Sequence, residues 1–143
     1  EPFSLNELLG QVRKPDDTKV KVAQNMLEIM ELEKEATLFA SELPLPKRRR
    51  LEIARTLARD PKVILLDEPA GGMTPKETES LAHLINKNVA PGRTCLVIEH
   101  KMDLIAEVCE DLCVINHGEK IAQGDPSVVF NKPEVIEAYL GKV

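Results

Sequence analysis

The chain has 143 residues, of which 43% are hydrophobic and 30% are charged, and its formal net charge is −5. This length supports one domain with a sizeable core, and the acidic balance argues against a nucleic acid as the main partner. No apolar run approaches the roughly 20 residues that cross a bilayer. The three cysteines, an odd number, fit a reduced cytosolic compartment.

The first third of the chain predicts amphipathic helices. Ser4 begins a capping-box pattern, so we expect a short helix over residues 5–13. Asp16 or Asp17 can cap a longer helix over residues 18–33. The apolar stripe of this longer helix recurs at helical spacing and comprises Val20, Ala23, Leu27 and Met30.

Two prolines then interrupt the helical pattern. The residue before each of Pro44 and Pro46 is pushed toward extended geometry. Pro46 suits the first turn of a following helix, where its missing N–H costs little, and we expect that helix over residues 47–59. Its inward-facing side chains are predicted to be Leu51, Ile53, Ala54, Leu57 and Ala58.

The chain is organised around the four aliphatic residues 63–66, which lie between Pro61 and Pro69. Such a run predicts a strand of a parallel sheet that is buried on both faces. Asp67 and Glu68 follow it directly. Open parallel sheets bind ligands outside the carboxyl ends of their strands, and Mg²⁺ takes oxygen ligands. The acidic pair therefore suggests magnesium and phosphate chemistry; the alternative is a simple loop or helix cap.

A helix and a second strand follow. Thr74 can cap the helix, with a proline at its first position. Residues 94–98 predict a second buried strand, parallel to the first. It delivers His100 to the same edge of the sheet as the acidic pair. The buried stripe of the intervening helix is predicted to comprise Leu81, Leu84, Ile85 and Val89.

The last third predicts a short helix, a hairpin and a helical tail. The hairpin turns at His117 and Gly118. The expected bounds are 102–108 for the helix, 112–116 and 120–122 for the strands, and 126–140 for the two tail helices.

Two further groupings are interpreted as structural. Cys109, Cys113 and His117 are spaced by four, but a helix-to-strand change lies between the two cysteines, so the spacing does not predict a tetrahedral metal site. The basic run at residues 47–50 is interpreted as a solvated helix face.

Four motifs recur in one order along the chain. Residues 49–57 read RRLEIARTL, residues 65–73 read LLDEPAGGM, residues 98–100 read IEH, and residues 135–141 read VIEAYLG. This series resembles the nucleotide-binding subunits of ABC transporters, and most closely those of the branched-chain amino acid uptake branch. The resemblance extends over essentially the whole chain.

The resemblance implies an α/β fold: a partial P-loop NTPase (RecA-like) parallel sheet with flanking helices, preceded by a helical subdomain. It implies that residues 1–59 form the helical subdomain, with a degenerate signature loop and its helix. Residues 60–143 then form the C-terminal part of the ATPase core, with two short tail helices.

The resemblance also implies roles for three side chains. Asp67 is similar to the Walker B aspartate, which holds magnesium mainly through water. Glu68 is similar to the base that polarises the hydrolytic water, and His100 to the switch histidine that contacts the γ-phosphate. Phosphoryl transfer depends on positioning and charge neutralisation, which agrees with this set. Taken alone, a hydrogen-bonded histidine at a strand end is the commoner case, and the resemblance to the family favours the switch histidine instead.

Two departures from the family matter. No G-x-x-x-x-G-K-[ST] occurs in these 143 residues, so the chain resembles the C-terminal part of such a subunit, without the Walker A phosphate cradle. Pro44, Leu45, Pro46 and Lys47 stand where the family has its signature loop, which grips the nucleotide of the opposite subunit through backbone N–H groups. Pro46 removes one such donor and stiffens the loop, so nucleotide binding by these four residues is expected to be degenerate.

We therefore expect the C-terminal portion of an ABC transporter ATP-binding protein. Its complete form would hydrolyse ATP, with Mg²⁺, to drive import of branched-chain amino acids or similar solutes. This chain alone is expected to bind no ATP or Mg²⁺ tightly and to be inactive. The alternative is a truncated or degenerate paralogue that hydrolyses nothing and acts only as a protein-interaction module.

The expected partners are a second nucleotide-binding subunit or a further copy of this chain, an integral membrane permease, and a segment that carries Walker A. Nucleic acid is not among them. Without the strand that carries the cradle, the strand at residues 63–66 has an unpaired apolar edge, which predicts self-association. The expected location is cytoplasmic, peripheral at the inner face of the cell membrane.

Overall fold

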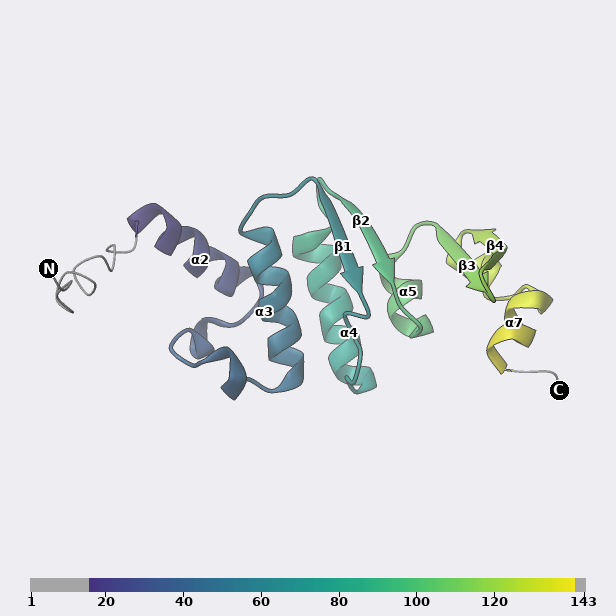
Figure 1. Cartoon of the computed structure of the whole chain (residues 1–143), viewed down its shortest axis with the longest axis horizontal. Helices are drawn as coiled ribbons and strands as arrows, with labels where there is room; N and C mark the ends of the chain where they lie inside the picture. Colours follow the sequence, from purple (N-terminus) through teal and green to yellow (C-terminus); the bar gives the residue numbers. More distant parts are fainter. Residues whose placement is uncertain (1–15, 141–143) are drawn as a thin grey trace, which may run out of the picture.

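The structure consists of a small parallel sheet, helices along one side of it, and a C-terminal hairpin with two short helices (Figure 1). The computed structural model describes residues 16–140, so the helix expected over residues 5–13 lies outside the described residues. The bounds are α2 Asp17–Ile29, the 3₁₀ turns η1 Glu33–Glu35 and η2 Ala40–Glu42, α3 Leu45–Leu57, β1 Val63–Asp67, α4 Pro75–Leu84, the π-helical turn η3 Ile85–Val89, β2 Thr94–Ile98, α5 Met102–Val108, β3 Leu112–Asn116, β4 Glu119–Gly124, α6 Pro126–Val129 and α7 Pro133–Leu140.

Helix α2 begins at the predicted cap and ends earlier than predicted. Asp16 accepts a hydrogen bond from the Thr18 N–H at 3.0 Å. The helix stops short of residue 33 because Glu31 adopts a φ of 56°, the left-handed conformation that commonly ends helices. Met30 is buried as predicted, whereas Val20 is exposed, because α2 extends away from the sheet (Figure 1).

Helix α3 begins slightly earlier than predicted, with Pro46 in its first turn as expected. Ala58, predicted to face inward, is the exposed C-cap of the helix. The predicted solvated basic face is wrong in part: Lys47 forms an ion pair with Glu35, and Arg50 donates to Glu31 at 2.9 Å. The buried residues of α3 are Ile53, Ala54 and Leu57.

Strands β1 and β2 are parallel, as predicted, with Asp67 opposite Ile98 at their carboxyl ends. The expectation that β1 is buried on both faces is wrong. Ile64 and Leu66 are buried, but Val63 and Leu65 are 60% and 71% exposed. In the part of the chain that the structure describes, helices lie along only one face of this pair (Figure 1). We call the other side the open sheet face; it comprises Val63, Leu65, Leu96 and Ile98.

Helix α4 covers the buried face. It begins with the predicted capping box, in which the Glu77 carboxylate accepts from the Thr74 N–H at 2.8 Å and the Thr74 hydroxyl accepts from the Glu77 N–H at 3.4 Å. The predicted stripe of Leu81, Leu84, Ile85 and Val89 is buried. This main core contains Ile53 as well as Ile64, so it joins residues from both sides of the boundary at residue 59, and that boundary stays a prediction.

The C-terminal part forms a second, smaller core. Strands β3 and β4 pair antiparallel around the predicted turn, where His117 and Gly118 have φ values of 48° and 83°. The two predicted tail helices are confirmed as α6 and α7. The buried residues of this second core are Ala122, Val129 and Val135. Among the described residues, no helix is long and apolar enough to cross a membrane.

Candidate active site

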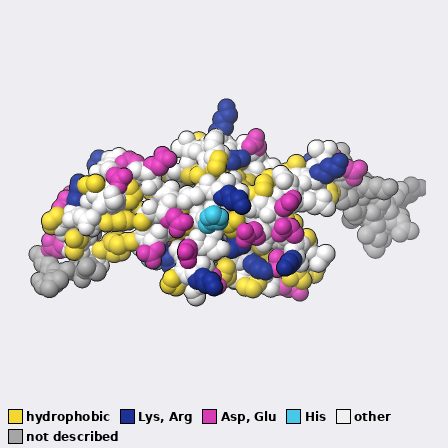
Figure 2. Space-filling view, turned by 180° about the vertical axis from the view of Figure 1, so that it is seen from behind, with side chains coloured by type: hydrophobic (Ala, Val, Ile, Leu, Met, Phe, Trp, Pro, Cys, Tyr) yellow, Lys and Arg dark blue, Asp and Glu magenta, His cyan; other side chains and the backbone are white. Residues whose placement is uncertain are grey.

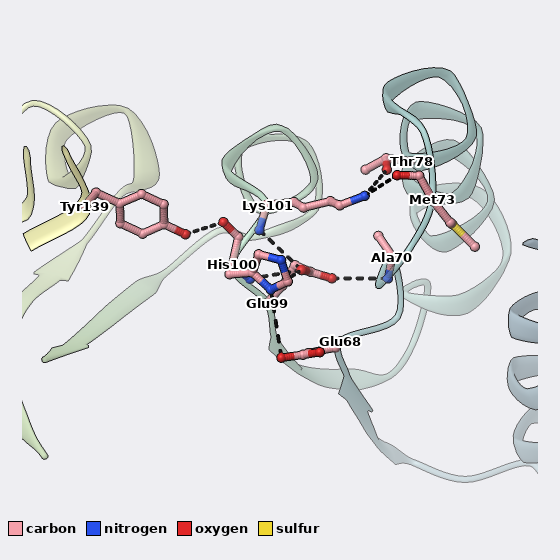
Figure 3. Close-up of polar contacts among 8 residues, drawn as sticks. All are labelled: Glu68, Ala70, Met73, Thr78, Glu99, His100, Lys101 and Tyr139. Carbon is pink, nitrogen blue, oxygen red and sulfur yellow. Dashed lines mark hydrogen bonds and ion pairs between the residues drawn. The ribbon is translucent and has the colours of Figure 1, made fainter. Parts of the chain in front are cut away.

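The structure brings Glu68 and His100 together at the carboxyl end of the parallel strands (Figure 3). The Glu68 N–H donates to the carbonyl of Ile98 at 2.8 Å, which extends the β1–β2 pairing by one residue. Glu68 Oε1 then lies 3.8 Å from His100 Nδ1. Asp67, the last residue of β1, stands beside this pair. The sequence prediction that the acidic pair and His100 share one edge is therefore supported by the geometry.

Glu68 has an unusual backbone conformation. Its φ is 44°, a left-handed value that costs a non-glycine residue roughly 1–3 kcal/mol and that is found often at functional sites. The bond to Ile98 and a bond from the Gly71 N–H to the Glu68 carbonyl, at 3.0 Å, hold it there. The Glu68 side chain is 61% exposed, so it is accessible to water and to a ligand.

The acidic pair can supply part of the ligand shell of a magnesium ion. Asp67 and Glu68 are both exposed and supply oxygen donors, and Asp67 also lines a cavity of about 120 Å³ between α3 and β1. Across residues 16–140, no group of three His, Cys, Asp or Glu side chains is arranged to hold a metal ion. Magnesium is commonly bound by one or two carboxylates together with waters and substrate phosphates. The residues present therefore fit Mg²⁺ bound jointly with a nucleotide.

Sequence reasoning missed Glu99. Its side chain is 0% exposed, and Oε1 accepts from the N–H groups of His100 and Lys101 at 2.9 and 3.2 Å. Oε2 accepts from the Ala70 N–H at 3.1 Å, and Oε1 lies 3.3 Å from His100 Nδ1. Hydrogen bonds to an ionised group are strong, which makes a buried carboxylate tolerable. Glu99 thus ties the end of β2 to the loop after β1 (Figure 3). Only the three-dimensional contact with Ala70 reveals this role.

Lys101 reinforces the same link. Its Nζ donates to the Met73 carbonyl at 2.5 Å and to the Thr78 hydroxyl at 3.2 Å. The two residues that flank His100 therefore both bind the glycine-rich loop at residues 69–74 or the helix that follows it (Figure 3). The contacts of Glu99 and Lys101 therefore set the position of His100 between them.

The predicted degenerate loop has structural partners. Pro44 is the N-cap of α3, and its carbonyl accepts from the Arg48 N–H at 3.0 Å. Leu45 packs so closely against Gly72 that a Cβ added there would lie 2.7 Å from Leu45 Cδ2. Pro46 is half-buried in the first turn, and Lys47 forms its ion pair with Glu35. Nucleotide binding by Pro44, Leu45, Pro46 and Lys47 stays a prediction.

The cysteines do not contribute to a site. Cys95, Cys109 and Cys113 are free thiols. Burial raises the pKa of the Cys95 and Cys109 thiols, so both stay protonated and unreactive at neutral pH.

Comparison with known proteins relates the chain to ATP-binding proteins of transporters. A family model described as ABC transporter matches residues 3–71, and one described as branched-chain amino acid ATP-binding cassette transporter matches residues 119–143. The chain is 39% identical over 131 residues to the high-affinity branched-chain amino acid transport ATP-binding protein BraF of Pseudomonas aeruginosa, covering 91% of this chain and 51% of BraF. It is 41% identical over 121 residues to the high-affinity branched-chain amino acid transport ATP-binding protein LivG of Escherichia coli, covering 84% of this chain and 48% of LivG. The chain spans about half the length of these curated relatives.

Solved structures share the fold. One is an ATP-binding cassette of an ABC transporter in its ADP conformation, with a TM-score of 0.81 and 29% identity over 99% of this chain and 57% of that chain. A nucleotide-free ATP-binding cassette gives the same TM-score and identity over 99% of this chain and 58% of that chain. The predicted α/β fold of P-loop NTPases is confirmed over the part that this chain spans.

Proposed function

Because this chain belongs to the ATP-binding proteins of ABC transporters, we propose that it supplies the acidic and histidine side of an ATPase site that drives uptake of branched-chain amino acids or similar solutes. The observation that carries this proposal is the geometry of Glu68. Its carboxylate is exposed, is held in a strained backbone conformation, and lies 3.8 Å from the His100 imidazole at the carboxyl end of β1.

The roles follow from this geometry. Asp67 would hold the hydration shell of Mg²⁺, and the ion would neutralise charge on the phosphate oxygens of ATP. Glu68 orients the attacking water and accepts its proton, a role that needs an accessible carboxylate within hydrogen-bond reach of that water. His100 donates to the terminal phosphate from the loop that follows the neighbouring strand β2. Positioning, rather than covalent chemistry, then does most of the catalytic work.

We propose that the phosphate cradle of this site is supplied by a segment that is not among these 143 residues, in which no G-x-x-x-x-G-K-[ST] occurs. We propose that the cradle-bearing segment covers the open sheet face. Val63, Leu65, Leu96 and Ile98 are each at least 56% exposed there. Fully burying one such side chain contributes about 1.5–3 kcal/mol, so covering all four is strongly favoured. A second copy of the chain is the alternative occupant.

The helix-covered side has a different character. Figure 2 shows acidic and basic side chains interspersed over the middle of that surface. Such mixed charge is suited to water or to a polar partner rather than to an apolar one. A membrane permease, a second ATP-binding subunit and a place at the inner face of the cell membrane are part of the proposal, supported by the descriptions of BraF and LivG as transport ATP-binding proteins.

The test is ATP hydrolysis by the complete gene product with and without Glu68→Gln. We expect kcat to fall by roughly 10²–10⁴-fold, the usual contribution of a general base, with KM for Mg-ATP little changed. Glu119→Gln, which alters an exposed carboxylate on β4, is the matched control and leaves kcat unchanged. Equal rates for the Glu68 variant and the unaltered protein would contradict the assigned role.

A non-hydrolysing interaction module is the second candidate. It is favoured by Pro44 and Pro46, because a proline N-cap and a proline in the first turn of α3 offer fewer N–H groups to a nucleotide. This candidate predicts that the complete gene product binds its permease and yet hydrolyses no ATP. Measurable hydrolysis that depends on Glu68 eliminates it.

A further inference from the structure

The main chain of His100 is held by side chains on both sides. Its N–H donates to the buried Glu99 carboxylate at 2.9 Å. Its carbonyl accepts a hydrogen bond from the Tyr139 hydroxyl, although Tyr139 lies 39 residues further along the chain (Figure 3). His100 follows β2 and precedes α5, so it belongs to neither element. These two side-chain contacts therefore fix a residue that regular secondary structure does not.

Tyr139 comes from a different structural unit. It lies on α7, one helical turn after Val135, and residues four apart share a helix face. Val135 is 1% exposed in the second core, with Ala122 of β4 and Val129 of α6. Helix α7 is thus held to the C-terminal unit through Val135, and its Tyr139 side chain, 45% exposed, reaches the edge of the parallel sheet with its hydroxyl.

The electrostatic surroundings keep this phenol protonated. Burial raises the pKa of Tyr139, and the negative charge of Glu99 raises it further. The hydroxyl is consequently a donor throughout the neutral range. The effect of Glu99 also indicates that its carboxylate lies near the phenol, so one acidic group influences both contacts of the His100 main chain.

We propose that Tyr139 is a positioning residue for His100: its hydroxyl fixes the His100 carbonyl, and helix α7 thereby determines where the imidazole lies relative to Glu68. Glu99 and Lys101 fix the same segment to the loop at residues 69–74. Tyr139 adds a tether to the second core. The hydrogen bond alone supports the claim that Tyr139 positions His100. The expected effect on ATP hydrolysis rests on the proposed function.

Tyr139→Phe in the complete gene product is the test, because it removes the hydroxyl and keeps the ring. The His100 imidazole signal in the NMR spectrum, identified as the one that His100→Gln removes, should shift or broaden. We expect kcat for ATP to fall by up to roughly tenfold, the loss of about one hydrogen bond, with KM and Tm nearly unchanged. Glu134→Gln, an exposed change on the same helix, is the control and alters none of these.

Two outcomes separate this inference from the proposed function. If the unaltered protein hydrolyses ATP but Tyr139→Phe changes neither kcat nor the His100 signal, the inference is wrong and the proposed function stands. If the unaltered protein hydrolyses no ATP, the proposed function fails, and the His100 signal still decides the positional link.

A measurement on the unaltered protein avoids any question of folding. These 143 residues contain one tyrosine and no tryptophan, so phenol ionisation of the purified chain can be followed by its absorbance. The pKa of Tyr139 should lie above the ordinary value of 10.0. A midpoint at the value of the unfolded chain would show that the phenol is in water and would overturn the tether.

Discussion

At the scale of single residues, the buried carboxylate of Glu99 is the most consequential group near the site. One side chain without solvent contact accepts three backbone N–H groups, from Ala70, His100 and Lys101. A buried carboxyl group is stable only when it is well hydrogen-bonded, and the approach of the two loops supplies the bonds that this side chain needs. Glu99 therefore makes the loop after β1 and the loop after β2 depend on each other.

We predict that Glu99→Gln destabilises the protein by about 1–3 kcal/mol, because the amide loses the charge and presents one N–H₂ group where the carboxylate accepted a bond. The measurement is urea-induced unfolding followed by circular dichroism. Glu110→Gln, an exposed change between α5 and β3, is the control. Equal midpoints for the two variants would show that Glu99 does not hold the loops together.

The sequence predicted only those site residues whose position follows from the residues next to them in the chain. Asp67, Glu68 and His100 follow apolar runs, so parallel pairing alone places them at one edge. Glu99 was not predicted because its partner Ala70 is 29 residues away and an acidic residue at a strand end has no distinctive pattern. The Tyr139 contact was missed for the same reason, since the hairpin and α6 separate it from His100.

At the scale of elements, the start of α3 and the loop after β1 fit closely together. Gly72 has a φ of 75° and faces the Leu45 side chain without room for a Cβ. Several elements were predictable from periodicity and caps, as in α4. The burial of β1 was not, because a run of aliphatic residues shows that a strand is apolar and does not show which segment covers each face.

We predict that Gly72→Ala destabilises the protein by about 2–4 kcal/mol, from left-handed strain and from the clash with Leu45. Gly92→Ala is the matched control, because Gly92 has a φ of 73° and a Cβ there meets nothing within 4 Å. Thermal unfolding of the two variants separates strain, which both share, from the clash. If both lose the same amount, Leu45 yields and the contact is not specific.

At the scale of the whole molecule, the open sheet face exposes four large apolar side chains. The view from behind shows acidic and basic side chains over the middle of the surface (Figure 2). Exposed apolar residues that gather on one sheet face usually mark an interface. The self-association predicted from the sequence rested on the edge of one strand. The structure extends that argument to the open sheet face, whose exposed apolar side chains add to the backbone groups at the strand edge.

We predict that the isolated chain self-associates at tens of micromolar, and that the double variant Leu65→Lys and Leu96→Lys does not, because lysine keeps this face in water. Analytical ultracentrifugation measures the difference. Ile115→Lys places the same charge at a 66% exposed position on β3 and leaves the association unchanged. A monomeric unaltered chain would show that the open sheet face does not bind a second copy.

The second core has a consequence for behaviour on warming. It buries only Ala122, Val129 and Val135 in the described chain, far fewer residues than the main core. Small units of this kind open at lower free energy than the whole fold. When this one loosens, Tyr139 withdraws and the imidazole loses its tether while the sheet is still intact. Gentle heating would thus slow turnover by up to roughly tenfold, reversibly and before the polypeptide melts.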